Sequence, residues 1–476
     1  MRQPSKQSDL TTVRQPALDL AARLLRDEPA LRSSLDFGRF VQQGQGFGPT
    51  LIIGDQAEIP LLRDALTTRR DYRMALLAKP TDVVIVRQQD IAYEHYLESH
   101  LGISNVTYLA PANPGNAPIA VLARTDNDLS GKIGKLAGSG FTLNTYFTTQ
   151  NSWRLAQHLG ESAKQLTQVS GPSARVSKRA NDKLWFTDLT RQLFGKTATP
   201  PTMSGYTIAA AAAEIVYLAK SCDQVVAKIP DSAGSAGNFT FRSADIAGNS
   251  ERAMQHILRA RLEATGWKDT FPILIGVWER DVLCSPSVQL WIPQPESGTP
   301  ICEGVFEQHT RNTEAAFIGA AISTLPSEMQ GTLSAEAITI ASVLQALGYF
   351  GRCSFDAVIH KTQDGANEIH WIECNGRWGG VSIPMTLAKT LNEGTLPDGF
   401  LVVQEERHDF PEAKTAECLT LLDDLLFRKG QQEEGLIMTA PPTGSGSFAV
   451  NLLALADTAS QAGFLIEKAL ARLRKG

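Results

Sequence analysis

FGRCSFDAVI (350–359) and NEIHWIECN (367–375) are two mainly apolar runs that each carry acidic or amide side chains. The intervening KTQDG contains Asp-Gly, which is typical of a hairpin turn, so we expect the two runs to be paired strands. Alternate residues of a strand point to one face, so Glu373 and Asn375 share a side that Asp356 on the partner strand can join. Burying these groups unpaired would cost roughly 1–3 kcal/mol each. Because two carboxylates and an amide oxygen form the all-oxygen set that suits Mg²⁺, the two strands predict a metal site.

Cationic side chains and small residues accompany this predicted metal site. Lys183 lies at the start of a predicted helix, and Lys228 ends the apolar strand that reads DQVVAKIP. The loop DSAGSAGN (231–238) follows, and its small residues let main-chain amides approach phosphate oxygens without a Cβ clash. We expect this loop to close over bound phosphates as a lid. Arg377 lies four residues after Glu373, at the strand end, where a guanidinium can meet a phosphoryl group.

Four segments in sequence order carry a resemblance to a known family: NDKLWF, VVAKIPDSAGSAGN, GRCSFDAVI and IHWIECNGRWGG. Together they resemble the ATP-grasp superfamily of carboxylate–amine ligases, over residues 173–395. The resemblance implies that Lys183 and Lys228 contact the phosphates of ATP. It also implies that Arg377, which matches the arginine of the family's E-x-N-x-R pattern, acts with Lys228 as a catalytic residue.

The same resemblance implies further binding residues. The implied ligands of magnesium, with manganese as the alternative ion, are Asp356, Glu373 and Asn375. The loop residues implied to bind the nucleotide are Ser232, Gly234, Ser235, Gly237 and Asn238. In this family the adenine hinge lies between two strands, which here corresponds to VWERDV, so Glu279 and Val282 are candidates for adenine and ribose contacts.

Three further residues are candidates for the carboxylate substrate. His309 and Arg311 follow a predicted central strand, in FEQHTRN, although a solvated loop explains both equally well. Arg352 resembles a strand arginine of some family members, but it lies four rather than two residues before Asp356.

The regions that flank the core are also similar to those of a known group of enzymes. Residues 1–172 contain the apolar runs PTLIIGD, DVVIVRQ and NVTYLAP with helical segments between them, which predicts a parallel α/β sheet. This block and the C-terminal residues 396–476 resemble the pre-ATP-grasp and C-terminal domains of pheganomycin-type peptide ligases. The predicted fold class is α/β, with α+β in the core: an open α/β pre-ATP-grasp domain, an ATP-grasp core at 173–395 and a small C-terminal domain at 396–476. The core is expected to comprise a lid-bearing subdomain (173–274) and a metal-binding subdomain (275–395).

Composition excludes several classes of protein. The 476 residues suggest about three domains. The net charge of −5 argues against a nucleic-acid binder, because no excess of positive charge is available to displace phosphate counterions. The longest apolar run, IAAAAAEIVYLA, carries Glu214 and is too short for a membrane span, and the first residues lack the apolar segment of a signal peptide. The six cysteines form no CxxC pair, so we expect a cytoplasmic protein with reduced thiols.

The resemblance predicts an ATP-dependent ligase that phosphorylates a carboxylate and then transfers the acyl group to an amine, in natural-product assembly. The expected partners are small-molecule or peptide carboxylates and amines, with no nucleic acid and no membrane; a homodimer stays open. Two alternatives also stay open. One is an ATP-grasp kinase that ends at a stable phosphoryl product, and the other is a nucleotide-binding regulator without activity.

Overall fold

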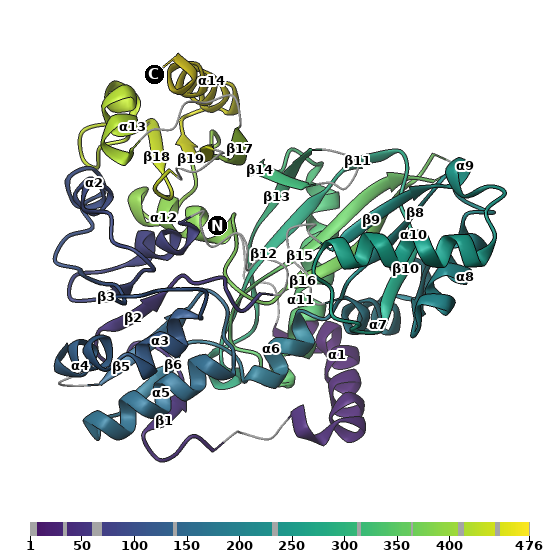
Figure 1. The fold of residues 1–476 in the computed structure, drawn as a ribbon, viewed down its shortest axis with the longest axis horizontal. Helices are drawn as coiled ribbons and strands as arrows, with labels where there is room; N and C mark the ends of the chain where they lie inside the picture. Colours follow the sequence, from purple (N-terminus) through teal and green to yellow (C-terminus); the bar gives the residue numbers. More distant parts are fainter. Residues whose placement is uncertain are drawn as a thin grey trace.

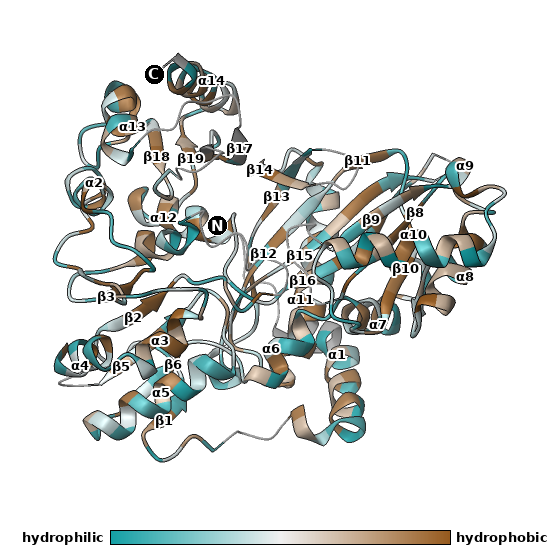
Figure 2. Cartoon of the chain, viewed as in Figure 1, coloured by the Kyte–Doolittle hydropathy of each residue, from teal (hydrophilic) through white to brown (hydrophobic). Residues whose placement is uncertain are grey.

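Three β-sheets and their covering helices make up the structure, which is a computed structural model (Figure 1). It describes residues 7–31, 36–59, 69–136, 140–230, 237–311, 316–362, 365–407, 414–442 and 448–475. Figure 2 shows hydrophobic colouring along strands such as β2 and β10, and mixed colouring along helices such as α5 and α10. This is the pattern of sheets covered by amphipathic helices.

The N-terminal sheet has six strands, all parallel, in the order β1-β6-β5-β2-β3-β4. The strands are β1 (Val41–Gln43), β2 (Thr50–Ile53), β3 (Val83–Ile85), β4 (Thr107–Leu109), β5 (Phe141–Thr145) and β6 (Thr167–Val169). The helices of this region are α2 (Ile91–Leu101), α3 (Ile119–Thr125), α4 (Asn127–Leu136), α5 (Gln150–Ala163) and α6 (Ala174–Ala180). The predicted parallel α/β sheet is confirmed.

A small antiparallel sheet follows, with the strand order β7-β10-β8-β9. Its strands are β7 (Thr202–Gly205), β8 (Gln224–Lys228), β9 (Asn238–Arg242) and β10 (Ile273–Val277). The helices of this part are α7 (Lys183–Phe194), α8 (Ile208–Leu218), α9 (Ser243–Ile246) and α10 (Glu251–Ala264). Apolar residues of α8, α10 and the strands form one buried cluster, so α8 and α10 cover this sheet together.

The large sheet carries the predicted metal ligands. Its order is β11-β15-β12-β13-β14-β17-β19-β18, with β16 paired to β15. The strands are β11 (Val282–Cys284), β12 (Pro286–Ile292), β13 (Ile301–Arg311), β14 (Ala316–Ile322), β15 (Gly351–Lys361), β16 (Asn367–Asn375), β17 (Leu401–Arg407), β18 (Gly435–Met438) and β19 (Phe448–Leu455). The paired strands predicted at 350–359 and 367–375 correspond to β15 and β16, which are antiparallel. The sheet therefore places Asp356 directly opposite Glu373.

Helices from distant parts of the chain contribute apolar residues to the two buried clusters that include strands of the large sheet. They are α1 (Gln7–Asp27), α11 (Ser327–Ala346), α12 (Ser382–Leu391), α13 (Thr415–Leu422) and α14 (Ala459–Lys475). Figure 1 shows α1 beside α11, away from the N-terminal sheet, and these two helices are in contact. The last strands, β17, β18 and β19, extend the large sheet. The domain boundaries stay predictions. No helix in the described ranges combines the length and apolar character that a membrane span requires.

Candidate functional site

A cavity of about 890 Å³ lies where the small sheet, the large sheet and the N-terminal region meet. We call it the large cavity. Ten residues named from the sequence line it: Lys183, Lys228, Asn238, Glu279, Val282, Arg311, Asp356, Glu373, Asn375 and Arg377. Residues that are almost 200 positions apart in the chain are thus brought together around one space.

The predicted metal ligands form a hydrogen-bonded group. Ser287 donates its hydroxyl to Oδ1 of Asp356 at 2.6 Å, and Asn375 donates its Nδ2 to Oδ2 of Asp356 at 2.8 Å. Glu373 lies on the strand opposite Asp356. Because all the possible ligand atoms are carboxylate and amide oxygens, the set fits a hard cation such as Mg²⁺.

The two carboxyl groups of this set differ in acidity. Burial and the neighbouring charge of Glu373 raise the pKa of Asp356 to about 6. Burial also disfavours ionisation of Glu373, but the charges of Lys183, Arg377 and Lys228 outweigh burial and lower its pKa. Lys183 is the nearest of these cations, with Nζ 3.2 Å from Oε2 of Glu373. The neighbouring cations therefore favour the ionised form of Glu373, whereas the ionised form of Asp356 would be stabilised by a further cation.

We predict that Asp356→Asn, which removes a predicted metal ligand, stabilises the ion-free protein at neutral pH. Folding raises the pKa of the Asp356 carboxyl from 3.8 to about 6. Ionisation of this carboxyl therefore does not lower the free energy of unfolding below pH 3.8, lowers it progressively between pH 3.8 and about 6, and lowers it by the full amount above about pH 6. Replacing the carboxyl by an amide should add about 1–3 kcal/mol to the free energy of unfolding at pH 7.5 and little at pH 4. Thermal denaturation without divalent ions at both pH values measures this; equal shifts at both would contradict it.

The two lysines approach the site from different elements. Lys183 is the first residue of α7, whose cap Asp182 accepts hydrogen bonds from the amides of Leu184 and Trp185. A buried lysine at a helix N-terminus lies at the positive end of the helix dipole, so its position costs free energy that Glu373 offsets. Lys228 ends β8, and burial together with the charge of Lys183 lowers its pKa to about 8. Lys183 is buried and Lys228 is half-buried, and two cations that interact in this way favour an anionic ligand.

Arg377 lies at the end of β16 and is held by amide side chains. Its Nη2 donates to Oδ1 of Asn375 at 2.5 Å, and its Nη1 donates to Oδ1 of Asn181. The amide oxygen of Asn375 thus accepts a hydrogen bond from the guanidinium. Asn375 stays a predicted metal ligand, and binding an ion through this oxygen would require that hydrogen bond to lengthen or to be shared.

Several sequence-predicted residues lie elsewhere or outside the described residues. Ser232, Gly234 and Ser235 belong to the segment that the structure does not describe, as does most of the predicted lid; Gly237 accepts a hydrogen bond from the amide of Ile229 at 2.9 Å. His309 is exposed on β13 and is not among the residues that line the large cavity.

Arg352 does not line the large cavity either. Its guanidinium pairs with Glu303 and lies over the rings of Trp291 and Trp378, with its Cζ 5.4 and 5.2 Å from the ring centroids. The ion pair and the two ring contacts give Arg352 a structural role in packing against Trp291 and Trp378.

The structure adds residues that the sequence did not single out. Ser287 and Gln289 alternate on β12, are each 3% exposed, and are linked by a hydrogen bond of 2.9 Å. The signal that could have identified them is their spacing, because two polar residues at alternate positions in an apolar strand face one side. Arg70 and Arg73, from the 3₁₀ helix η3 (Arg70–Leu77), also line the large cavity.

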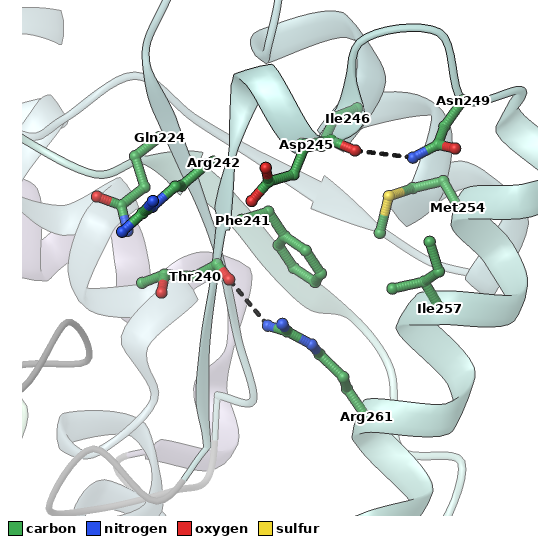
Figure 3. Close-up of a pocket in the computed structure, with 10 residues that line it drawn as sticks. All are labelled: Gln224, Thr240, Phe241, Arg242, Asp245, Ile246, Asn249, Met254, Ile257 and Arg261. Atoms are coloured by element: carbon green, nitrogen blue, oxygen red, sulfur yellow. Dashed lines mark hydrogen bonds between the residues drawn. The ribbon is translucent and has the colours of Figure 1, made fainter.

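A second cavity, of about 300 Å³, lies on the small sheet beside α10 (Figure 3). It is lined by Thr240, Phe241 and Arg242 of β9, by Asp245 and by Arg261 among others. Arg261 donates to the carbonyl of Thr240 at 2.8 Å, and its guanidinium stacks on Phe241. Asp245 is the only carboxylate among the described residues that line this cavity, so the cavity lacks the several converging carboxylates and cations of the large one.

Comparisons with known proteins agree on the fold. Residues 71–161 match the family described as the pre-ATP-grasp domain. No curated protein matches the chain. A biotin carboxylase domain of 2-oxoglutarate carboxylase from Hydrogenobacter thermophilus, in complex with MgADP and bicarbonate, is 14% identical, with a TM-score of 0.54, and 90% of each chain is covered.

Two further solved structures are similar at comparable levels. N5-carboxyaminoimidazole synthetase from Staphylococcus aureus, complexed with ADP, is 10% identical with a TM-score of 0.51, over 91% of this chain and 100% of that one. Pyruvate carboxylase from Rhizobium etli is 13% identical with a TM-score of 0.54, over 90% of this chain but only 37% of that longer one. Identities this low report on the fold alone. The chain therefore has a mixed α/β architecture of the ATP-grasp type, with a pre-ATP-grasp domain in its N-terminal region.

Proposed function

We propose that this protein is an ATP-dependent ligase that joins a carboxylate to an amine through an acyl phosphate. The observation that supports it best is the convergence of two lysines, two carboxylates, an amide and an arginine on the large cavity. Cations for a triphosphate and oxygen ligands for Mg²⁺ are the groups that phosphoryl transfer from ATP requires. The solved structures of similar fold include complexes with ADP and with MgADP, which favours the same ligand here.

The acid substrate is proposed to bind at the end of the large cavity formed by the N-terminal region. Arg73 is 4% exposed yet lines this cavity, and it donates a hydrogen bond to the amide oxygen of Asn451. No carboxylate of the described residues pairs with Arg73. Burial lowers its pKa to about 9, so it is still mainly charged at neutral pH. A buried cation that faces a cavity without a charged partner favours an anionic ligand.

The proposed reaction has two steps. An oxygen of the acid attacks the γ-phosphorus of ATP, the bond to the β-phosphate oxygen breaks, and ADP leaves. The amine nitrogen then attacks the acyl carbon, the carbon–oxygen bond breaks, phosphate leaves and the amine proton is lost to solvent. Magnesium, where bound, neutralises charge on the phosphates. Lys183, Lys228 and Arg377 would orient and neutralise the transferred group, so positioning and electrostatics would provide the catalysis.

The finer proposal is that the product is a peptide bond made in natural-product assembly. It is supported by the likeness of the sequence flanks to those of pheganomycin-type peptide ligases. The large cavity, at about 890 Å³, is also near the upper end of the volumes usual for ligand pockets. A peptide or amino-acid amine would enter beside the acid.

A hydroxylamine assay tests the reaction class. The full-length protein is first screened for ADP release with combinations of carboxylates and amines. The carboxylate that supports ADP release is then supplied with ATP and hydroxylamine, without an amine. We expect a hydroxamate of that acid, with one ADP for each hydroxamate, because an acyl phosphate reacts with hydroxylamine and an alcohol phosphate ester does not. Adding the natural amine should lower the hydroxamate and raise the amide. A stable phosphorylated product that hydroxylamine leaves untouched would identify a kinase instead.

Arg73→Gln should weaken binding of the acid substrate and leave ATP binding nearly unchanged. A hydrogen bond to a charged group is worth about 1.5–3 kcal/mol, so the KM for the acid should rise by about 10- to 100-fold. The KM values of both substrates are measured with the acid found in the screen. Arg154→Gln, at an exposed position of α5, is the matched control. An unchanged KM for the acid would contradict the assignment of Arg73.

A further inference from the structure

A cluster of two histidines and two glutamates lies where β15 and β16 are joined, away from Asp356. His360 and Glu368 face each other across the two strands, and His370 is two residues further along β16. Glu279 approaches them from the segment after β10 and also lines the large cavity. The side chains of Glu279, His360 and His370 are 13%, 12% and 7% exposed. These three side chains are thus largely shielded from water, whereas that of Glu368 is 36% exposed.

The side chains converge in a way that suits one ion. The two imidazole rings lie side by side, with centroids 4.4 Å apart. Oε1 of Glu279 is 2.9 Å from Nδ1 of His370, and Oε2 is 3.9 Å from Nδ1 of His360. A tetrahedral ion with bonds of about 2.0–2.1 Å separates its ligand atoms by about 3.3 Å. These two separations bracket this value, and the ligand atoms of the three residues all lie within 4.8 Å of one another. Side-chain rotations that release Nδ1 of His360 from its 3.3 Å contact with the carbonyl of Lys361 would place one ion between the three groups.

Glu368 completes the arrangement from the other edge of the rings. Its Oε2 is 3.6 Å from Nε2 of His360 and 3.8 Å from Nε2 of His370. Nε2 of His360 is buried and has no hydrogen-bond partner among the described residues. Histidines that bind a metal through one nitrogen commonly donate the other N–H to a carboxylate, which orients the ring. Glu368 is placed to accept such hydrogen bonds from both histidines.

We propose that Glu279, His360 and His370 bind a divalent transition ion of the zinc class, at a site separate from the magnesium ligands. Two imidazole nitrogens and one carboxylate are the donors that Zn²⁺ and Co²⁺ accept readily, whereas Mg²⁺ prefers an all-oxygen set. Three protein ligands leave one position open for water. Because Glu279 also lines the large cavity, ion binding and ligand binding there are expected to affect each other equally.

Cobalt absorption tests this site without relying on catalysis. The full-length protein carrying Asp356→Asn, which disables the magnesium set, is titrated with Co²⁺. We expect visible ligand-field absorption that saturates at one ion per chain and is displaced by Zn²⁺ but not by excess Mg²⁺. His370→Ala and Glu279→Gln should each weaken Co²⁺ binding at least tenfold, and Glu368→Gln should weaken it less.

His256→Ala, at an exposed position on α10, is the matched control and should leave Co²⁺ binding unchanged. Circular dichroism verifies the fold of each variant, and His360→Gln replaces His370→Ala if the more buried substitution prevents folding. Absence of saturable absorption, displacement by Mg²⁺, or absorption that survives both histidine substitutions would overturn the site. None of these readouts depends on ATP turnover, so they are independent of the proposed ligase activity.

Discussion

Glu373→Gln should abolish ATP turnover while leaving the protein folded. The carboxylate lies 3.2 Å from Nζ of Lys183 and opposite Asp356. The amide of glutamine keeps its shape but loses the negative charge that attracts both lysines and the proposed metal ion. A charge pair at 4 Å is worth about 4 kcal/mol at an effective dielectric constant of 20. A loss of this size corresponds to a decrease in kcat/KM of about 10³-fold.

The measurement is ADP release by the purified variant, with the acid and amine identified in the screen. Glu328→Gln, at an exposed position in the first turn of α11, makes the same chemical change away from the cavity and should keep full activity. A Glu373→Gln protein with the turnover of the unmodified protein would eliminate Glu373 as a metal ligand.

Lys228→Met is expected to be the second most damaging change, with its main effect on the nucleotide. Lys228 is the last residue of β8, and its ammonium group interacts electrostatically with Lys183 and Glu373. Methionine preserves most of the apolar stem and removes the ammonium group. We expect kcat/KM for ATP to fall by about 10²- to 10³-fold, from the loss of one close charge interaction.

Binding of a non-hydrolysable ATP analogue with Mg²⁺, measured by calorimetry, separates affinity from chemistry. Lys220→Met, at an exposed position after α8 in the same part of the chain, is the control for removing a lysine. Analogue affinity that is equal in the Lys228→Met and Lys220→Met proteins would contradict a phosphate contact by Lys228.

The part of the site on β15 and β16 could be predicted because its signal is local. Polar residues at alternate positions of apolar strands, with Asp-Gly between the strands, are visible within some 25 residues, and the register of β15 with β16 agrees with that expectation. The short strands β1 and β6, of three residues each, carry no comparable periodic signal. They are defined by pairing to each other and to β5, which is a tertiary property.

Arg73 could not be predicted for a related reason. Its neighbours in sequence, in RDYRMALL, look like any short helical segment. Its partner Asn451 lies 378 residues away, on β19. Only packing of the N-terminal region against the end of the large sheet turns an ordinary arginine into a buried cation that faces the cavity. The sequence likewise predicts a helix within residues 16–25 but contains no sign of its contact with α11.

That contact between α1 and α11 affects how the chain folds during synthesis. Ala17, Leu20 and Ala21 of α1 are buried in the same cluster as Leu333 and Ile340 of α11. A ribosome that adds about 5–20 residues per second needs roughly 15–60 s to reach α11 after making α1. Throughout that interval the surface of α1 that packs on α11 has no native partner, although α7, which is made earlier, contacts α1 as well. The nascent chain is therefore expected to be a chaperone client before its last strands are translated.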